Sequence, residues 1–206
     1  MDDKPILLGT ASARRHHVLR GLGFPFDVAT AETEEILFPG DPVRTAVENA
    51  RRKFDALRPR FMDRWMLTAD TVVFIDGACL GKPATVEEGV RMLRSYSNRE
   101  QLVVTGMIFA APHGAPESRA ERSWISFGAI TEADARDYLA RFGTIDRAGA
   151  YDLDSLRPFV REIRGSASNI RGLPAETVRD WFAARGAPFA QDGRQPPRPR
   201  AGIAMA

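Results

Sequence analysis

The sequence predicts an α/β protein: a mixed, twisted sheet with flanking helices, arranged as two lobes around a central cleft. Three observations lead to this prediction. Strand-like runs alternate with helical patterns through the first half of the chain, which is typical of α/β folds. The dipeptide Asp76-Gly77 and the segment 112–120 follow strand-like runs and predict hairpins, which add antiparallel pairs to the sheet. The 206 residues, 44% of them hydrophobic, are enough to bury a substantial core.

The elements of the first half follow from local patterns. Asp41 and Pro42 predict a helix that ends near Leu57, because Asp caps helix N-termini and Pro suits the first helical position. Thr85, followed by Glu88 at capping-box spacing, predicts another helix start. Apolar and β-branched runs predict strands at residues 6–8, 24–29, 66–75 and 78–81, and an amphipathic run predicts a helix at residues 12–22.

The second half continues the alternation. The polar segment 112–120 predicts a loop, and Gly106 is expected to interrupt a strand. Thr131 predicts the cap of a helix, and Gly186 predicts the end of a final one. The three predicted strands lie at residues 101–111, 123–127 and 159–163, and the final helix lies at residues 174–185.

Composition and charge predict one globular domain, residues 1–189, followed by a disordered tail rich in Pro, Gln and Arg at residues 190–206. The formal net charge is +2, and the tail carries all of it with three Arg and one Asp. The rest of the chain is formally neutral. Bulk charge therefore does not indicate a nucleic-acid surface, and no nucleic-acid partner is expected.

Cysteine usage and hydropathy limit the class further. Cys79 is the single cysteine, which excludes an intramolecular disulfide and a cysteine-based metal cluster. The first four residues lack the basic start and apolar core of a signal peptide. No apolar run is long enough to cross a bilayer. We therefore expect a cytoplasmic protein with no membrane partner.

The segment Leu8-Gly9-Thr10-Ala11-Ser12-Ala13-Arg14-Arg15 is the most informative part of the chain. It places small residues and two arginines between a strand and a helix start. Free N–H groups at a helix start and the fork-shaped guanidinium groups of arginine both suit phosphate. The segment predicts a polyphosphate cradle. Taken alone, however, the segment favours a simpler interpretation, a helix cap at Thr10 or Ser12 followed by solvated arginines.

A few charged residues further along the chain could complete such a site. Asp70 interrupts an apolar strand, where a carboxylate is costly unless it is paired or binds a metal. It is a candidate Mg²⁺ ligand or general base, or else a salt-bridged residue at a strand end. Lys82, held between Gly81 and Pro83, could bind phosphate or be a solvated turn residue. Lys53 could belong to the site or to a basic solvent face of its helix, and the pair Glu34-Glu35 could hold a metal or simply lie on the surface.

Taken in order, these pieces resemble the Maf family, nucleoside triphosphate pyrophosphatases once described as septum-formation inhibitors. The resemblance extends roughly from Pro5 to Phe189. Its weak but ordered motifs are the L-A-S-x-S-P-R-R-like segment 8–15, the acidic pair 34–35, Lys53, A-D-T-V-V at 69–73, G-K-P at 81–83, T-G at 105–106, A-G-A-Y at 148–151, and G-S with S-N and G-L-P between 165 and 174.

The resemblance implies a Maf/ITPase-like fold and hydrolysis of a nucleoside triphosphate to the monophosphate and pyrophosphate with a divalent cation, Mg²⁺ or Mn²⁺. Asp70 and Glu35 would bind the metal and serve catalysis, with Glu34 as a possible substitute for Glu35. Lys82 would assist as a catalytic and phosphate-binding residue. The resemblance also suggests a homodimer. The residues that would contact the substrate are Thr10, Arg14, Arg15, Lys53, Lys82 and Asp154.

One departure from the family pattern concerns substrate choice. The family members that act on dTTP and UTP have glutamine where this chain has Asp154. Together with Asp152 it adds two carboxylates near the expected triphosphate, which would repel it unless a cation intervenes. Besides a pyrophosphatase of dTTP, UTP or a modified nucleotide, this segment leaves open a low-activity nucleotide-binding regulator linked to cell division. A nucleic-acid-binding protein that uses the tail is a third alternative.

Overall fold

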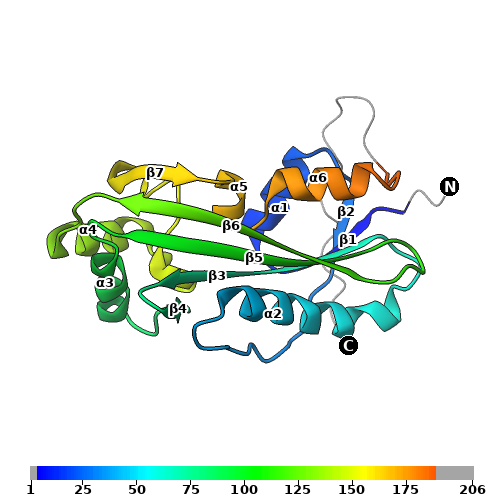
Figure 1. Ribbon diagram of the computed structural model, residues 1–206, viewed down its shortest axis with the longest axis horizontal. Coiled ribbons are helices and arrows are strands. Elements are labelled where there is room, and N and C mark those ends of the chain that lie inside the picture. The colour runs from blue at the N-terminus through cyan, green and yellow to red at the C-terminus, as the bar shows by residue number, and fades with distance from the viewer. Residues whose placement is uncertain (1–3, 189–206) are drawn as a thin grey trace.

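The computed structural model describes residues 4–188 and places one mixed, seven-stranded sheet in that part of the chain (Figure 1). Strand β1 is parallel to β2 and β3, and the other strand pairs are antiparallel, so the predicted mixed sheet is confirmed. The predicted tail lies outside the described residues. Along the sheet the order is β2 (Phe26–Val28), β1 (Ile6–Gly9), β3 (Met66–Ile75), β5 (Glu100–Ala110), β6 (Glu117–Phe127) and β7 (Val160–Arg164), with β4 (Ala78–Leu80) paired to β3.

Helices cover the sheet at both ends of its long strands. Helix α2 lies along one face, α1 and α6 lie on the other face near β1 and β2, and α3 and α4 pack together at the far end (Figure 1). Separate apolar clusters form at the two ends, as a two-lobed arrangement requires. No helix in residues 4–188 is long and apolar enough to span a membrane. The helices are α1 (Ala13–Gly21), α2 (Pro42–Leu57), α3 (Val86–Ser95), α4 (Glu132–Phe142), α5 (Ala167–Ile170) and α6 (Ala175–Ala183).

The predicted helix caps are present, with one difference. Asp41 accepts a hydrogen bond from the Arg44 backbone N–H, and Thr131 forms a complete capping box with Asp134. Thr85 accepts from the backbone N–H of Glu88, as predicted. The Glu88 carboxylate, however, accepts from the Ala84 N–H, one residue before the cap. Thus the expected reciprocal bond to Thr85 is replaced by a bond to its neighbour.

Two sequence predictions in the second half are wrong. Gly106 does not interrupt β5: it pairs with Asp70 on β3 and with Ala120 on β6. The predicted loop at 112–120 is also too long, because β6 begins at Glu117 and pairs with β5 from there. Gly106 is needed for packing, since a Cβ there would lie 2.4 Å from the backbone of Ala46 in α2. Helix α2 therefore rests on the sheet beside Asp70.

One edge of β3 has a gap between its partner strands. Strand β5 pairs with one edge of β3 over residues 66–74. On the other edge, β1 pairs with residues 66–68 and β4 with residues 73–75. Residues 69–72 lie between them, just beyond the carboxyl end of β1, and are called here the open edge of β3. Ligand sites in open α/β sheets form at such positions.

Candidate active site

A cleft of about 780 Å³ follows the open edge of β3, and its lining includes Asp70 and Thr71, which point to opposite faces of the strand. It is lined by the segment after β1, the start of α1, helix α2, strand β3 and the loops around residues 81 and 147. The structure thereby brings together most of the predicted site residues: Thr10, Arg14, Arg15, Glu35, Lys53, Asp70 and Lys82.

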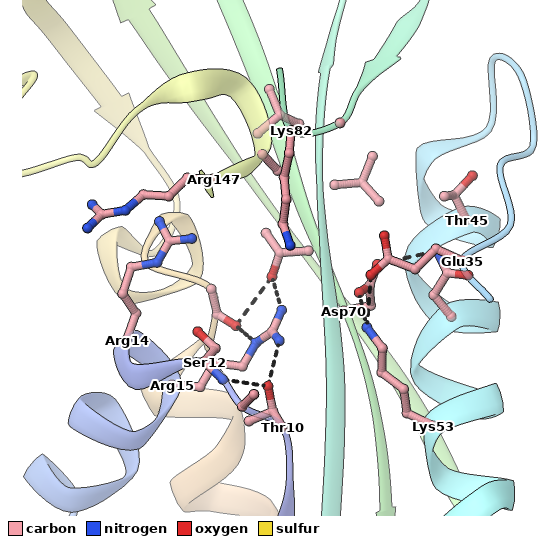
Figure 2. A pocket seen from close by; sticks show the side chains of 18 of the residues that line it. Thr10, Ser12, Arg14, Arg15, Glu35, Thr45, Lys53, Asp70, Lys82 and Arg147 are labelled. Atoms are coloured by element: carbon pink, nitrogen blue, oxygen red, sulfur yellow. Dashed lines mark hydrogen bonds and ion pairs between the residues drawn. The ribbon is translucent and has the colours of Figure 1, made fainter. Parts of the chain in front are cut away.

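Asp70 lies on the side of the cleft formed by α2 (Figure 2). The Lys53 ammonium is 2.6 Å from Asp70 Oδ1 and 3.4 Å from a Glu35 oxygen, so one cation connects two carboxylates. Asn49 donates to Asp70 Oδ2 at 3.4 Å. Asn49 and Lys53 are four residues apart and therefore share one face of α2. The close contact at Gly106 holds this helix face against the strand that carries Asp70.

Arg15 lies across β3 from Asp70 (Figure 2). Successive strand residues point to opposite faces of a sheet, so Thr71 faces the arginine side while Asp70 faces α2. Arg15 donates to the Gly172 carbonyl at 2.8 Å and to the hydroxyls of Thr71 at 2.9 Å and Thr10 at 3.1 Å. None of these partners is an anion. Burial lowers the pKa of Arg15, and the Asp70 charge acts in the opposite direction.

Arg14 and Lys82 are the unpaired cations of the cleft. Within residues 4–188, neither side chain makes a hydrogen bond or ion pair. Burial lowers the pKa of Arg14, and the neighbouring charge of Arg147 lowers it further. A half-buried arginine without a counter-ion is electrostatically unfavourable, and an anionic ligand at Arg14 would relieve this. This side of the cleft is therefore suited to phosphate.

Asp70 and Glu35 are two of the carboxylates that line the cleft, and by themselves they do not make up a complete set of metal ligands. Asp70 and Glu35 both contact Lys53, and no group of three metal-ligating side chains exists in the described part of the chain. Mg²⁺ is commonly held by one or two carboxylates together with substrate phosphates and waters. The donor set therefore fits a divalent cation shared with a bound triphosphate, and it does not form an all-protein cage.

Two sequence candidates lie outside the cleft lining: Asp154 and Glu34. Arg171 donates to both Asp154 oxygens, at 2.6 and 3.1 Å, and these bonds lower the pKa of Asp154. Asp152 is 2.8 Å from Arg147. Each added carboxylate thus has an arginine partner, so the expected repulsion of a triphosphate is offset by cations of the chain itself.

Asn49 and Arg147 are among the polar residues of the cleft that sequence reasoning missed. Asn49 could have been found from its four-residue spacing to Lys53 on one helix. Arg147 stands directly before the A-G-A-Y segment, and no local pattern assigns it a role. Only the folded chain places it beside Arg14, because 132 residues separate the two in sequence.

Together, the sheet and the cleft define a mixed α/β protein with a site suited to an anionic ligand. The fold is similar to that of a solved structure of the Staphylococcus aureus Ham1 protein, with a TM-score of 0.53 and 11% identity over 88% of this chain and 100% of that chain. The chain belongs to the Maf family: residues 5–185 match the family described as Maf-like protein.

Curated relatives agree with this membership. A protein of Deinococcus radiodurans named dTTP/UTP pyrophosphatase is 34% identical over 174 residues, which cover 84% of this chain and 89% of the relative. A protein of the same name from Anaeromyxobacter dehalogenans is 36% identical over 178 residues, covering 84% and 90%. The resemblance seen in the sequence is thus confirmed at the level of the family.

Proposed function

We propose that this protein is a nucleoside triphosphate pyrophosphatase that converts its substrate to a nucleoside monophosphate and pyrophosphate. One observation carries the proposal: a single cleft places the Asp70 carboxylate on one side of the open edge of β3 and unpaired cations on the other. The names of the relatives favour dTTP or UTP as substrate, and a modified nucleotide is the other candidate. Hydrolysis of a phosphoanhydride requires a group that accepts a proton from the attacking water and positive charges that neutralise the phosphates.

In the proposed mechanism, the α-phosphate lies at the open edge of β3, near Asp70. Asp70 accepts a proton from the attacking water while the α–β phosphoanhydride bond breaks and pyrophosphate leaves. Lys53 and Asn49 orient the Asp70 carboxylate through the contacts described above. Lys82, Arg14 and Arg15 neutralise the charge of the phosphates and of the departing pyrophosphate.

A divalent cation is part of this proposal. Asp70 and Glu35 would hold it together with phosphate oxygens. When bound, it would supply charge neutralisation at the phosphates and a more acidic water. Lys53 already contacts both carboxylates and keeps them close to each other.

The test is a panel of standard and modified triphosphates assayed with Mg²⁺, with Mn²⁺ and with a chelator. We expect equimolar monophosphate and pyrophosphate, with no orthophosphate, and at least one pyrimidine triphosphate among the substrates. Removal of the metal should lower turnover by about 100-fold or more, because the cation contributes several kcal/mol to charge stabilisation. Orthophosphate as the first product, or full turnover with chelator, would contradict the proposal.

The second candidate is a nucleotide-binding regulator with little catalysis. The segment Asp152-Leu153-Asp154-Ser155 motivated it, because carboxylates would oppose triphosphate binding. Asp152 and Asp154 are both paired with arginines, so the argument that they oppose triphosphate binding is weakened. Tight triphosphate binding without turnover, under every metal tested, would favour the regulator.

A further inference from the structure

The arginine side of the cleft contains a second guanidinium group at its outer end. Arg147 lies between two short 3₁₀ turns, η2 (Thr144–Asp146) and η3 (Ala148–Ala150). Figure 2 shows its side chain beside that of Arg14. Arg147 is also the cation with the strongest electrostatic effect on Arg14. Two like charges at close range repel each other, and an anion bound between them would make the net electrostatic energy of the three charges favourable.

The position of Arg147 is fixed by its surroundings. Asp152 Oδ2 is 2.8 Å from the Arg147 guanidinium, and Asp152 Oδ1 accepts from the Asp154 backbone N–H at 3.0 Å. The backbone N–H of Gly149 donates to the Gly81 carbonyl at 3.0 Å, which joins this turn to the segment of Lys82. The side chain of Arg147 is 31% exposed, so it remains accessible to a ligand in the cleft.

The charges of the cleft follow an order. Arg15 is influenced by Asp70, then Arg14 and Glu35. Arg14, whose pKa is lowered first by burial, is influenced by Arg147, Asp152, Tyr151 and Asp146, and in Figure 2 Arg15 lies between Arg14 and Asp70. Arg15 therefore lies between the carboxylate side and the Arg14–Arg147 pair. If the α-phosphate is at Asp70, a triphosphate that extends across the open edge of β3 carries its terminal phosphate toward that pair.

We propose that Arg14 and Arg147 together bind the pyrophosphate end of the triphosphate, and that Asp152 is the positioning residue for Arg147. This inference rests on the proposed function for the direction of the substrate. Two arginine forks suit the phosphate group that carries the most charge and the most free oxygens. The ion pair with Asp152 fixes the guanidinium group of Arg147. The same ion pair offsets the negative charge of Asp152, which would otherwise repel the phosphates.

The first test compares Arg147→Gln with the wild-type full-length chain by calorimetric titration with inorganic pyrophosphate and, separately, uridine monophosphate. We expect the Kd for pyrophosphate to rise about 10-fold or more, as for loss of a charged hydrogen-bonding group. The Kd for uridine monophosphate should stay within about 2-fold. The matched control is Arg136→Gln on α4, which removes the same charge from a residue paired with Glu132 outside the cleft and should change neither Kd.

Direct binding keeps this inference separate from the proposed function. If the wild-type chain hydrolyses no triphosphate, but its pyrophosphate binding depends on Arg147, only the proposed function fails. If the chain is an active pyrophosphatase and Arg147→Gln binds pyrophosphate as the wild type does, only this inference fails. Loss of uridine monophosphate affinity in place of pyrophosphate affinity would also overturn it. If Arg147→Gln does not fold, Arg147→Lys replaces it in the test, because lysine keeps the positive charge and lacks the guanidinium group. An unchanged pyrophosphate affinity of Arg147→Lys would refute joint binding by Arg14 and Arg147.

A second variant tests the role of Asp152. Asp152→Asn removes a negative charge from the neighbourhood of the ligand, so simple electrostatics predicts tighter binding of pyrophosphate. A positioning role predicts the opposite: a Kd for pyrophosphate about 3- to 10-fold higher, because Arg147 loses its nearer carboxylate partner and keeps only the exposed Asp146 at 3.5 Å. A Kd equal to or lower than that of the wild type would refute the positioning role. A melting curve that matches the wild type would show that the change is local.

Discussion

The variant Asp70→Asn is expected to lose turnover by about 100- to 10,000-fold while it still binds triphosphate, as for removal of a general base. The substitution keeps the shape of the side chain and removes its charge. Lys53, which is 2.6 Å from Asp70 in the wild type, would then retain only Glu35 as an anionic partner. Its freed charge should leave the Kd for triphosphate unchanged or lower. The measurement is single-turnover pyrophosphate release together with triphosphate binding.

The matched control for this variant is Asp63→Asn. Asp63 forms an exposed ion pair with Lys4 and does not line the cleft. It should keep turnover within about 2-fold of the wild type, since exposed ion pairs contribute little. Turnover of Asp70→Asn within the same range would show that Asp70 neither accepts the proton nor holds a required metal. A rise in KM without a fall in kcat would instead reduce Asp70 to a binding residue.

The sequence predicted the elements that have strong local signals. The strand at Met66–Ile75 was predicted with its observed bounds because it is a long β-branched run that ends at an Asp-Gly turn. The helix Pro42–Leu57 was predicted because Asp41 caps it and Pro42 occupies its first turn. In both cases the determinants are within a few residues of the element's ends.

The errors in the second half have long-range causes. Within its local sequence, Gly106 predicts a break in the strand. The structure shows that glycine is needed there because helix α2, about 60 residues earlier in the chain, packs against this position. The first half of β6 is polar and follows a segment with two prolines and a glycine, so the pattern predicts a loop at 112–120 and a strand only from residue 123. The strand conformation of residues 117–122 comes from pairing with the long apolar strand β5, which no local pattern reveals.

The same distinction applies to the site. Asp70 was noticeable because a carboxylate within an apolar strand is unusual, and the structure places it in the cleft with the predicted cations. The partners of Asp154 and Arg147 could not be read from the sequence. Arg171, which lies 17 residues after Asp154 at the end of α5, contacts it only in the folded chain. Likewise, Arg147 lies near Arg14 only when the segments on the two sides of the cleft come together.

The contact between Gly106 and α2 makes Gly106→Ala the second substitution with a large expected effect. The new Cβ would lie 2.4 Å from backbone atoms of Ala46 and Val47, which cannot move as a flexible side chain could. Helix α2 must shift away from the sheet, and it carries both Asn49 and Lys53. We expect a loss of about 2–3 kcal/mol in the free energy of unfolding, as for an overpacked core. Turnover should fall about 100-fold, because a displacement on the order of 1 Å misplaces Lys53 against Asp70.

Urea unfolding and kcat measured on the same preparations check this result, with Gly21→Ala as the matched control. A Cβ at Gly21 meets nothing within 4 Å, and alanine favours the helix, so the control should be as stable as the wild type or more stable by up to about 1 kcal/mol. If Gly106→Ala lost stability but kept full turnover at low temperature, the packing would matter only for folding. If Gly106→Ala lost both stability and turnover but bound pyrophosphate normally, the position of α2 would be shown to set the geometry around Asp70. The arginine side of the cleft would then be unaffected by the substitution.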